Sequence, residues 1–74
     1  MTRHDVPLRG EFIELHNLLK FCAIADSGGQ AKVLVGDGLV TVDGEQELRK
    51  TRKLYAGSVV RIWDHEIHVL PSEA

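Results

Sequence analysis

Four cationic side chains fall within five residues of this sequence, at Arg49, Lys50, Arg52 and Lys53. Upstream, residues 27–32 read Ser-Gly-Gly-Gln-Ala-Lys, which is a glycine-rich start for a helix. The N-terminus of a helix presents unpaired backbone N–H groups that bind anions, and a basic strand folded beside it supplies charge for a second anion. The two features together predict adjacent phosphate sites, and nucleic acid is the commonest ligand that offers them.

Other kinds of chemistry find little support in the sequence. His65 and His68 resemble an H-x-x-H metal motif, but on a hairpin this spacing puts the rings on opposite faces, so we expect surface histidines and no metal. Cys22 falls on the apolar side of a predicted helix, where it suits a small core filler. The sequence has no Ser, His and Asp in the order of a catalytic triad and no G-x-G-x-x-G loop that would bind a dinucleotide. We therefore predict no enzyme activity, no cofactor and no small-molecule substrate.

Length and composition predict one small domain. The chain has 74 residues, of which 43% are hydrophobic and 27% charged, close to ordinary globular usage. Its single cysteine excludes an internal disulfide, which fits a reducing compartment. Apolar stretches are too short to span a membrane, and residues 1–5 lack the apolar core of a signal peptide. We therefore expect a cytoplasmic monomer.

The first half of the sequence predicts two helices. Residues 1–10 show no periodicity and predict a flexible N-terminal arm, and residues 71–74 predict a similar tail. Between them, a short strand near Phe12 precedes residues 15–22, whose apolar positions have helical spacing. Ser27 then begins a capping box with Gln30, and the second helix ends at the glycines of residues 36–38.

The second half predicts two hairpins. Residues 39–42 form a strand that turns at Asp43-Gly44, and residues 47–54 return as its partner. Residues 59–63 and 67–70 form a second hairpin across residues 64–66. The expected fold class is therefore α+β, with two packed helices on a small, mainly antiparallel sheet.

Five segments in this order resemble the S-four RNA-binding domain family. They are Glu14-Leu15-x-x-Leu18-Leu19-Lys20, Ser27-Gly28-Gly29-Gln30-Ala31-Lys32, Gly38-Leu39-Val40-x-Val42-Asp43-Gly44, Glu47-x-Arg49-Lys50-x-x-Lys53 and Gly57-x-x-Val60. The resemblance covers residues 11–70, and it is nearest to the small stand-alone bacterial proteins of the YbcJ type. It implies the alpha-L motif, in which a helix pair joins a small sheet.

The resemblance also implies where RNA binds. In the family, RNA lies across the start of the second helix and the adjoining hairpin. The implied contacts in this chain are Ser27, Gly28, Gly29, Gln30 and Lys32 on the helix, and Arg49, Lys50 and Lys53 on the basic strand. Arg52, in the same basic run, is added to the predicted RNA-binding residues. The pattern leaves open which way Arg52 and Lys20 face. Family members often have arginine at position 32, and the lysine here supplies a point charge without arginine's planar fork.

The aromatic residues predict how RNA is recognised. Phe12 and Trp63 fall in apolar strand patterns and are expected in the core, Phe21 is ambiguous, and Tyr55 alone suits base stacking. A stacking platform of several aromatic residues is therefore not expected. Recognition must then come from contacts to the RNA backbone and from the shape of the RNA. This predicts a structured RNA partner of the ribosomal RNA or tRNA type.

Two alternatives remain open at the level of sequence. The formal net charge of −2 suits an adaptor that docks an acidic or ribosome-associated protein through the basic strand. A nucleotide-binding regulator would need a concave apolar pocket, which a chain of this length scarcely provides.

Overall fold

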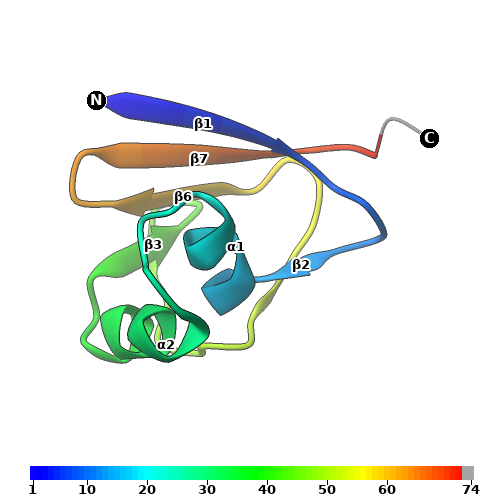
Figure 1. The fold of residues 1–74 in the computed structure, drawn as a ribbon. Helices are drawn as coiled ribbons and strands as arrows, with labels where there is room; N and C mark the ends of the chain where they lie inside the picture. Colours follow the sequence, from blue (N-terminus) through cyan, green and yellow to red (C-terminus); the bar gives the residue numbers. More distant parts are fainter. Residues whose placement is uncertain (73–74) are drawn as a thin grey trace.

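A computed structural model describes residues 1–72, and the predicted tail at residues 71–74 therefore lies partly outside the described residues. Two helices cover one face of a five-stranded sheet with strand order β1-β7-β6-β3-β4, and β2 pairs separately with β5 (Figure 1). The elements are β1 Thr2–Pro7, β2 Ile13–Glu14, α1 Leu15–Phe21, α2 Gly28–Gly36, β3 Val40–Val42, β4 Glu45–Gln46, β5 Lys53–Leu54, β6 Val59–Ile62 and β7 His65–Leu70. The predicted α+β class with two packed helices is confirmed.

Strand β1 corrects the expectation of a flexible arm over residues 1–10. Thr2–Pro7 pair in parallel with β7 along their full length, and this is the parallel pair of an otherwise antiparallel sheet. Val6 is only 4% exposed, and Nε2 of His4 lies 3.0 Å from Nδ1 of His65. The sequence concealed this strand because one buried apolar residue among polar neighbours gives no clear alternation.

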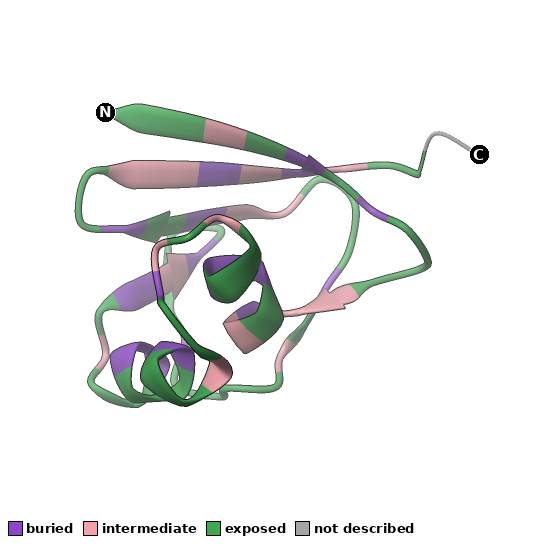
Figure 2. Cartoon of the chain, in the orientation of Figure 1, coloured by how far each residue is buried: buried purple, intermediate pink, exposed green. Residues whose placement is uncertain are grey.

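The core lies between the sheet and the helices. Leu15, Leu18 and Leu19 of α1 are fully buried, as the helical spacing predicted. From α2, Ala31, Leu34 and Val35 are buried, whereas the opposite side of that helix is exposed (Figure 2). Their partners are the alternate apolar residues of the sheet: Val40, Val42, Val60, Ile62, Ile67 and Val69. Helix α1 thus packs on α2, and the buried residues of both helices belong to one core cluster with those of the sheet.

Cys22 follows α1 and packs against this core. Burial raises the pKa of its thiol, which disfavours the thiolate form. The structure therefore agrees with a packing role for the cysteine.

The first hairpin is shorter than predicted. Asp43 and Gly44 have φ angles of 52° and 87°, the left-handed pair that a tight two-residue hairpin turn requires. Glu45–Gln46 pair with β3, and the N–H of Glu47 adds one bond to the carbonyl of Val40 at 3.0 Å before the chain leaves the strand. The prediction that residues 47–54 form the partner strand is therefore wrong. Residues 47–52 form an irregular loop, and the chain then pairs with β2 through β5.

The second hairpin turns earlier than expected. Trp63 and Asp64 connect β6 to β7, and Trp63 adopts a φ of 52°. Its side chain is 60% exposed, so the expectation that it belongs to the core is wrong. Phe12, also expected in the core, is 40% exposed. Strand periodicity predicted burial at both positions, but Trp63 is a turn residue and Phe12 precedes β2.

Candidate nucleic-acid interface

The start of α2 has the geometry of an anion site. Ser27 caps the helix, its Oγ accepting from the N–H of Gln30 at 3.1 Å, and Oε1 of Gln30 accepts from the N–H of Asp26 at 2.6 Å. The capping box is therefore confirmed, with Gln30 reaching one residue further back than predicted. The first intrahelical bond is donated by Ala31 to the carbonyl of Ser27 at 3.0 Å. The N–H groups of Gly28 and Gly29 precede this bond and have no acceptor within the helix.

The fold itself does not require glycine at these two positions. A Cβ added at Gly28 would meet no heavy atom within 4 Å, and one at Gly29 would lie 3.8 Å from Oγ of Ser27, an ordinary contact. Neither residue has a positive φ. The absence of side chains leaves the two amides accessible, which is the arrangement that an approaching phosphate needs.

The basic segment is a loop organised by one buried carboxylate. Glu47 is 7% exposed and accepts backbone N–H bonds from Leu48 and Arg49, both at 3.0 Å. The guanidinium of Arg49 donates to both carboxylate oxygens, at 3.3 and 3.2 Å, and that of Arg52 donates at 2.8 Å. Hydrogen bonds from the Arg49 side chain and backbone and from Arg52 lower the pKa of Glu47 to about 2. Glu47 is therefore ionised and holds both arginines in place.

The same loop closes the N-terminus of α1. Glu14 precedes the helix but makes no capping bond through its side chain. Instead, the N–H of Leu15 donates to the carbonyl of Arg52 at 2.9 Å, and that of His16 donates to Lys50 at 3.1 Å. These bonds attach the backbone of the loop to the helix, so its side chains are presented outward from a fixed base.

A shallow hollow lies on the loop. It has a volume of about 400 Å³ and is lined by Arg49, Thr51, Arg52 and Lys53. Three of these four side chains are cationic, and Glu47, which pairs with two of them, is buried behind them. The hollow therefore offers positive charge and hydrogen-bond donors to an anionic ligand.

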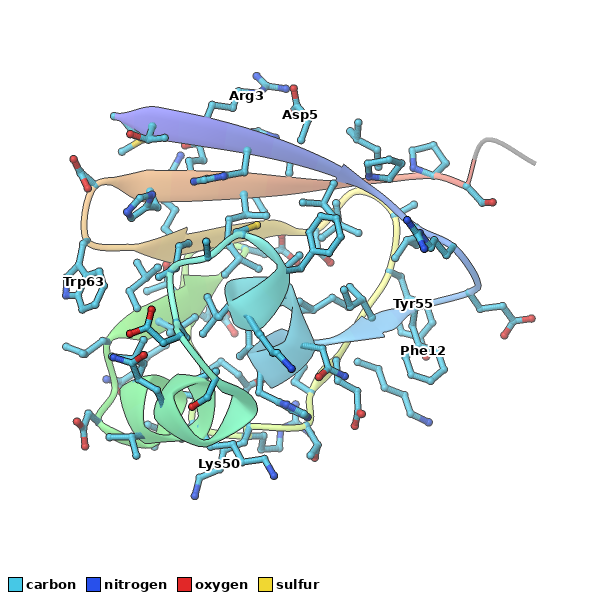
Figure 3. All side chains as sticks on the ribbon, viewed as in Figure 1. Arg3, Asp5, Phe12, Lys50, Tyr55 and Trp63 are labelled. Carbon is cyan, nitrogen blue, oxygen red and sulfur yellow. The ribbon has the colours of Figure 1, made fainter. Side chains whose placement is uncertain are left out.

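The loop lies against α2 through Lys50. A Cβ placed on Gly36 would come 3.5 Å from Cε of Lys50, so the aliphatic stem of this lysine covers the last turn of the helix. Figure 3 shows Lys50 below α2, with its side chain directed into solvent. Gly36 is eight residues beyond Gly28, about 12 Å along the helix axis. The structure therefore joins the basic loop to α2 at the end opposite to the glycine pair.

The predicted contact residues thus fall into two groups. The loop meets α2 at Gly36, about 12 Å along the helix axis from Gly28, so the structure does not show the two groups as the adjacent sites that the sequence predicted. Ser27, Gly29, Gln30 and Lys32 are exposed at or near the start of α2, with Gly28 half-buried among them. Arg49 and Lys50 are exposed on the loop, and Lys53 is exposed where β5 begins. Arg52 is half-buried and turned toward Glu47. Lys20, whose direction the sequence left open, is exposed in the last turn of α1.

Sequence reasoning missed Glu47 as the residue that shapes the loop. The signal was an acid placed two and five residues before Arg49 and Arg52, which permits one carboxylate to accept from both guanidinium groups. It also missed the pairing of Phe12 with Tyr55, whose ring centroids are 6.1 Å apart. That pair joins residues distant in sequence, and only the pairing of β2 with β5 brings them together.

The part of the chain that the structure describes contains no candidate metal site. Among residues 1–72, no group of three or more His, Cys, Asp or Glu side chains is placed to hold an ion. His65 lies against His4, and Nε2 of His68 lies 2.6 Å from Oε1 of Glu66, so the two histidines of the H-x-x-H motif have separate partners. Within the same range, neither helix is long and apolar enough to cross a membrane.

A helix pair on a small sheet, with a basic loop closing the first helix, defines this chain as a domain of the alpha-L type. The sequence model of the S4 domain family matches residues 6–70. This is the S-four family that the sequence resembles. The chain belongs to the S4 domain family.

Similar proteins support this membership. The chain is 41% identical over 58 residues to the "Putative RNA-binding protein YbcJ" of Escherichia coli (strain K12), which covers 78% of this chain and 83% of that protein. It is 42% identical over 59 residues to the "Probable ribosome maturation protein RlbA" of Bacillus subtilis (strain 168), covering 80% and 83%. The solution structure of E. coli YbcJ, described as revealing an alfaL motif involved in RNA-binding, superposes with a TM-score of 0.65 and 36% identity over 95% of this chain and 87% of that one.

Proposed function

We propose that this chain is a non-catalytic RNA-binding protein that recognises structured RNA, of the ribosomal RNA or tRNA type, through the phosphate backbone. One group of contacts is made by the start of α2 and another by the basic loop, Arg49 to Lys53. The protein acts as a monomer, because both groups belong to one chain. The names of its relatives, one an RNA-binding protein and one a ribosome maturation protein, support an RNA partner and a ribosomal setting.

The observation that carries the proposal is the hollow on the basic loop. Four cationic side chains and one carboxylate leave the segment from Glu47 to Lys53 with three excess positive charges. The carboxylate is buried behind the arginines, so a ligand in the hollow meets the cations first. Loop residues held by Glu47 and by the amides of α1 lose little freedom when a phosphate binds, which favours affinity.

The proposal is tested by measuring the affinity of purified protein for a structured RNA, such as a ribosomal RNA hairpin, at fixed ionic strength. Lys50→Ala and Lys53→Ala each remove a cation that is not paired with Glu47, so both are expected to weaken binding severalfold. Arg3→Ala is the matched control. Arg3 is exposed on β1, pairs with Asp5 at 2.9 Å and lies at the far side of the molecule from Lys50 (Figure 3).

Equal affinities for the wild type and the two lysine variants would contradict the proposed interface. A loss of the same size in Arg3→Ala would show that binding follows overall charge and has no defined site. Circular dichroism of each variant serves as the folding control, because these exposed substitutions are expected to change stability by no more than about 0.5 kcal/mol.

A further inference from the structure

Two aromatic rings lie exposed beside the basic loop. Phe12, just before β2, is 40% exposed, and Tyr55, just after β5, is 52% exposed. Their ring centroids are 6.1 Å apart and their planes are inclined by 53°. Figure 3 shows both rings at one edge of the molecule, on the side away from Trp63. Single exposed aromatics are ordinary on protein surfaces, but two in contact form a small apolar platform.

Lys53 connects this platform to the hollow. Its side chain lines the hollow, and its Nζ lies 4.9 Å from the centroid of the Phe12 ring. Lys53 and Tyr55 are two residues apart on one extended segment, about 7 Å along the chain. A nucleotide whose phosphate contacts Lys53 therefore has its base within reach of the aromatic pair.

We propose that Tyr55, supported by Phe12, is a stacking site for one unpaired nucleobase of the RNA bound by the basic loop. This inference rests on the proposed function and specifies it further, because the preferred ligand becomes a structured RNA with a bulged or looped-out base. Aromatic faces stack with any base, so the site adds preference for an unpaired nucleotide without adding sequence specificity.

Tyr55 is the ring that offers a face to the base. The ammonium group of Lys53 occupies one face of Phe12, and the inclination of the two planes prevents a base from inserting between them in parallel. Phe12 instead supports Tyr55 from the side. The backbone carbonyl of Tyr55 accepts from the N–H of Ser58 at 3.2 Å, which holds the segment independently of the ring.

The test compares two RNA duplexes, each made of two strands without a loop, that differ only by one bulged nucleotide. Tyr55→Ala is expected to weaken binding of the bulged duplex by about 5- to 150-fold and to leave binding of the fully paired duplex within about twofold of the wild type. Tyr55→Phe keeps the ring and is expected to bind like the wild type. Tyr55→Leu keeps apolar area without an aromatic face and is expected to resemble the alanine variant. Trp63→Ala, at another exposed aromatic, is the control and is expected to have no effect on either RNA.

The outcomes separate this inference from the proposed function. If Tyr55→Ala binds both duplexes as the wild type does, or loses equal affinity for both, the stacking site is refuted while RNA binding stands. If the wild type binds neither duplex, the proposed function fails. Rescue by leucine would show apolar contact in place of stacking and would also refute the inference. Thermal unfolding of each variant confirms that the platform can be altered without loss of the fold.

Discussion

At the scale of single residues, Glu47 decides the shape of the basic surface. A buried carboxylate is tolerated only when it is paired and hydrogen-bonded, and Glu47 accepts from two backbone amides and two guanidinium groups. The arrangement fixes Arg49 and Arg52 while leaving Lys50 and Lys53 free of it. One acid thus turns a run of mobile cations into a surface with a defined shape.

The stability of the protein should therefore depend on the ionisation of Glu47. Its pKa is about 2 in the folded chain against an ordinary value of 4.5, so the folded state binds this proton more weakly than the unfolded state does. The contribution of Glu47 is complete above about pH 4.5, decreases as the pH falls and is lost near pH 2. Glu47→Gln is expected to lower the free energy of unfolding by about 1–2 kcal/mol at neutral pH, because two backbone amides and two cations lose a charged acceptor.

Urea unfolding of the wild type and Glu47→Gln across this pH range measures the effect. The difference between the two proteins should shrink as the pH approaches 2. A difference that stays constant from neutral pH to pH 2 would mean that Glu47 does not titrate in the folded chain as described. Glu45→Gln, at an exposed acid on the neighbouring strand β4, is the matched control.

At the scale of elements, the start of α2 is a place where a substitution can weaken RNA binding without weakening the fold. A Cβ at Gly28 has open space and the backbone there is not left-handed, so Gly28→Ala is expected to fold with unchanged stability or a gain of up to about 1 kcal/mol. The added methyl group lies next to the free amides, so affinity for structured RNA is expected to fall about two- to tenfold. Thermal unfolding and RNA titration of the same variant measure the two effects.

Ser27→Ala is the comparison variant, because it is expected to lower stability where Gly28→Ala is not. Removing the capping hydroxyl is expected to reduce stability by about 1 kcal/mol, because the N–H of Gln30 loses its acceptor. If Gly28→Ala binds RNA as tightly as the wild type, the glycine amides are not part of the interface.

Strand β1 gives a third prediction. Val6 is buried against the core from a strand that pairs with β7, so Val6→Ala is expected to lower the free energy of unfolding by about 1–3 kcal/mol. Arg3→Ala, on the same strand but exposed, is expected to change it by less than about 0.5 kcal/mol. Denaturant unfolding distinguishes the two variants, and equal stability of Val6→Ala and the wild type would mean that β1 contributes little to the fold.

The elements that the sequence predicted well are those in which local signals agree. Ser27 and Gln30 cap a helix whose apolar residues have helical spacing, and Asp43-Gly44 marks a tight turn. The basic segment was misread as a strand because its loop conformation depends on Glu47 accepting from side chains up to five residues away. The exposure of Phe12 likewise follows from the pairing of β2 with β5, which no local pattern reveals.

At the scale of the whole molecule, the charge of the chain and the charge of the interface have opposite signs. The net charge is −2, so long-range attraction to RNA is weak, and binding must come from local neutralisation of phosphates. Carboxylates elsewhere are often paired with cations of their own, as in Arg3–Asp5 and Arg61–Glu66. These pairs lie on the sheet strands, away from the basic loop. The basic loop is thus a local positive region on a chain whose net charge is negative.

The local positive charge of the basic loop predicts a strong but limited dependence of binding on salt. About four phosphate contacts, each releasing about 0.7 to 0.9 counterion, give a slope near −3 when the logarithm of the association constant is plotted against that of the salt concentration. Removing Lys50 or Lys53 should make the slope shallower by about one each, whereas Arg3→Ala should leave it unchanged. For an RNA with a bulged nucleotide, Tyr55→Ala should lower affinity at every salt concentration without altering the slope, because stacking releases no counterions. A slope near zero for the wild type would contradict a phosphate-based interface, and an altered slope in Tyr55→Ala would mean that this residue acts through the charged groups beside it.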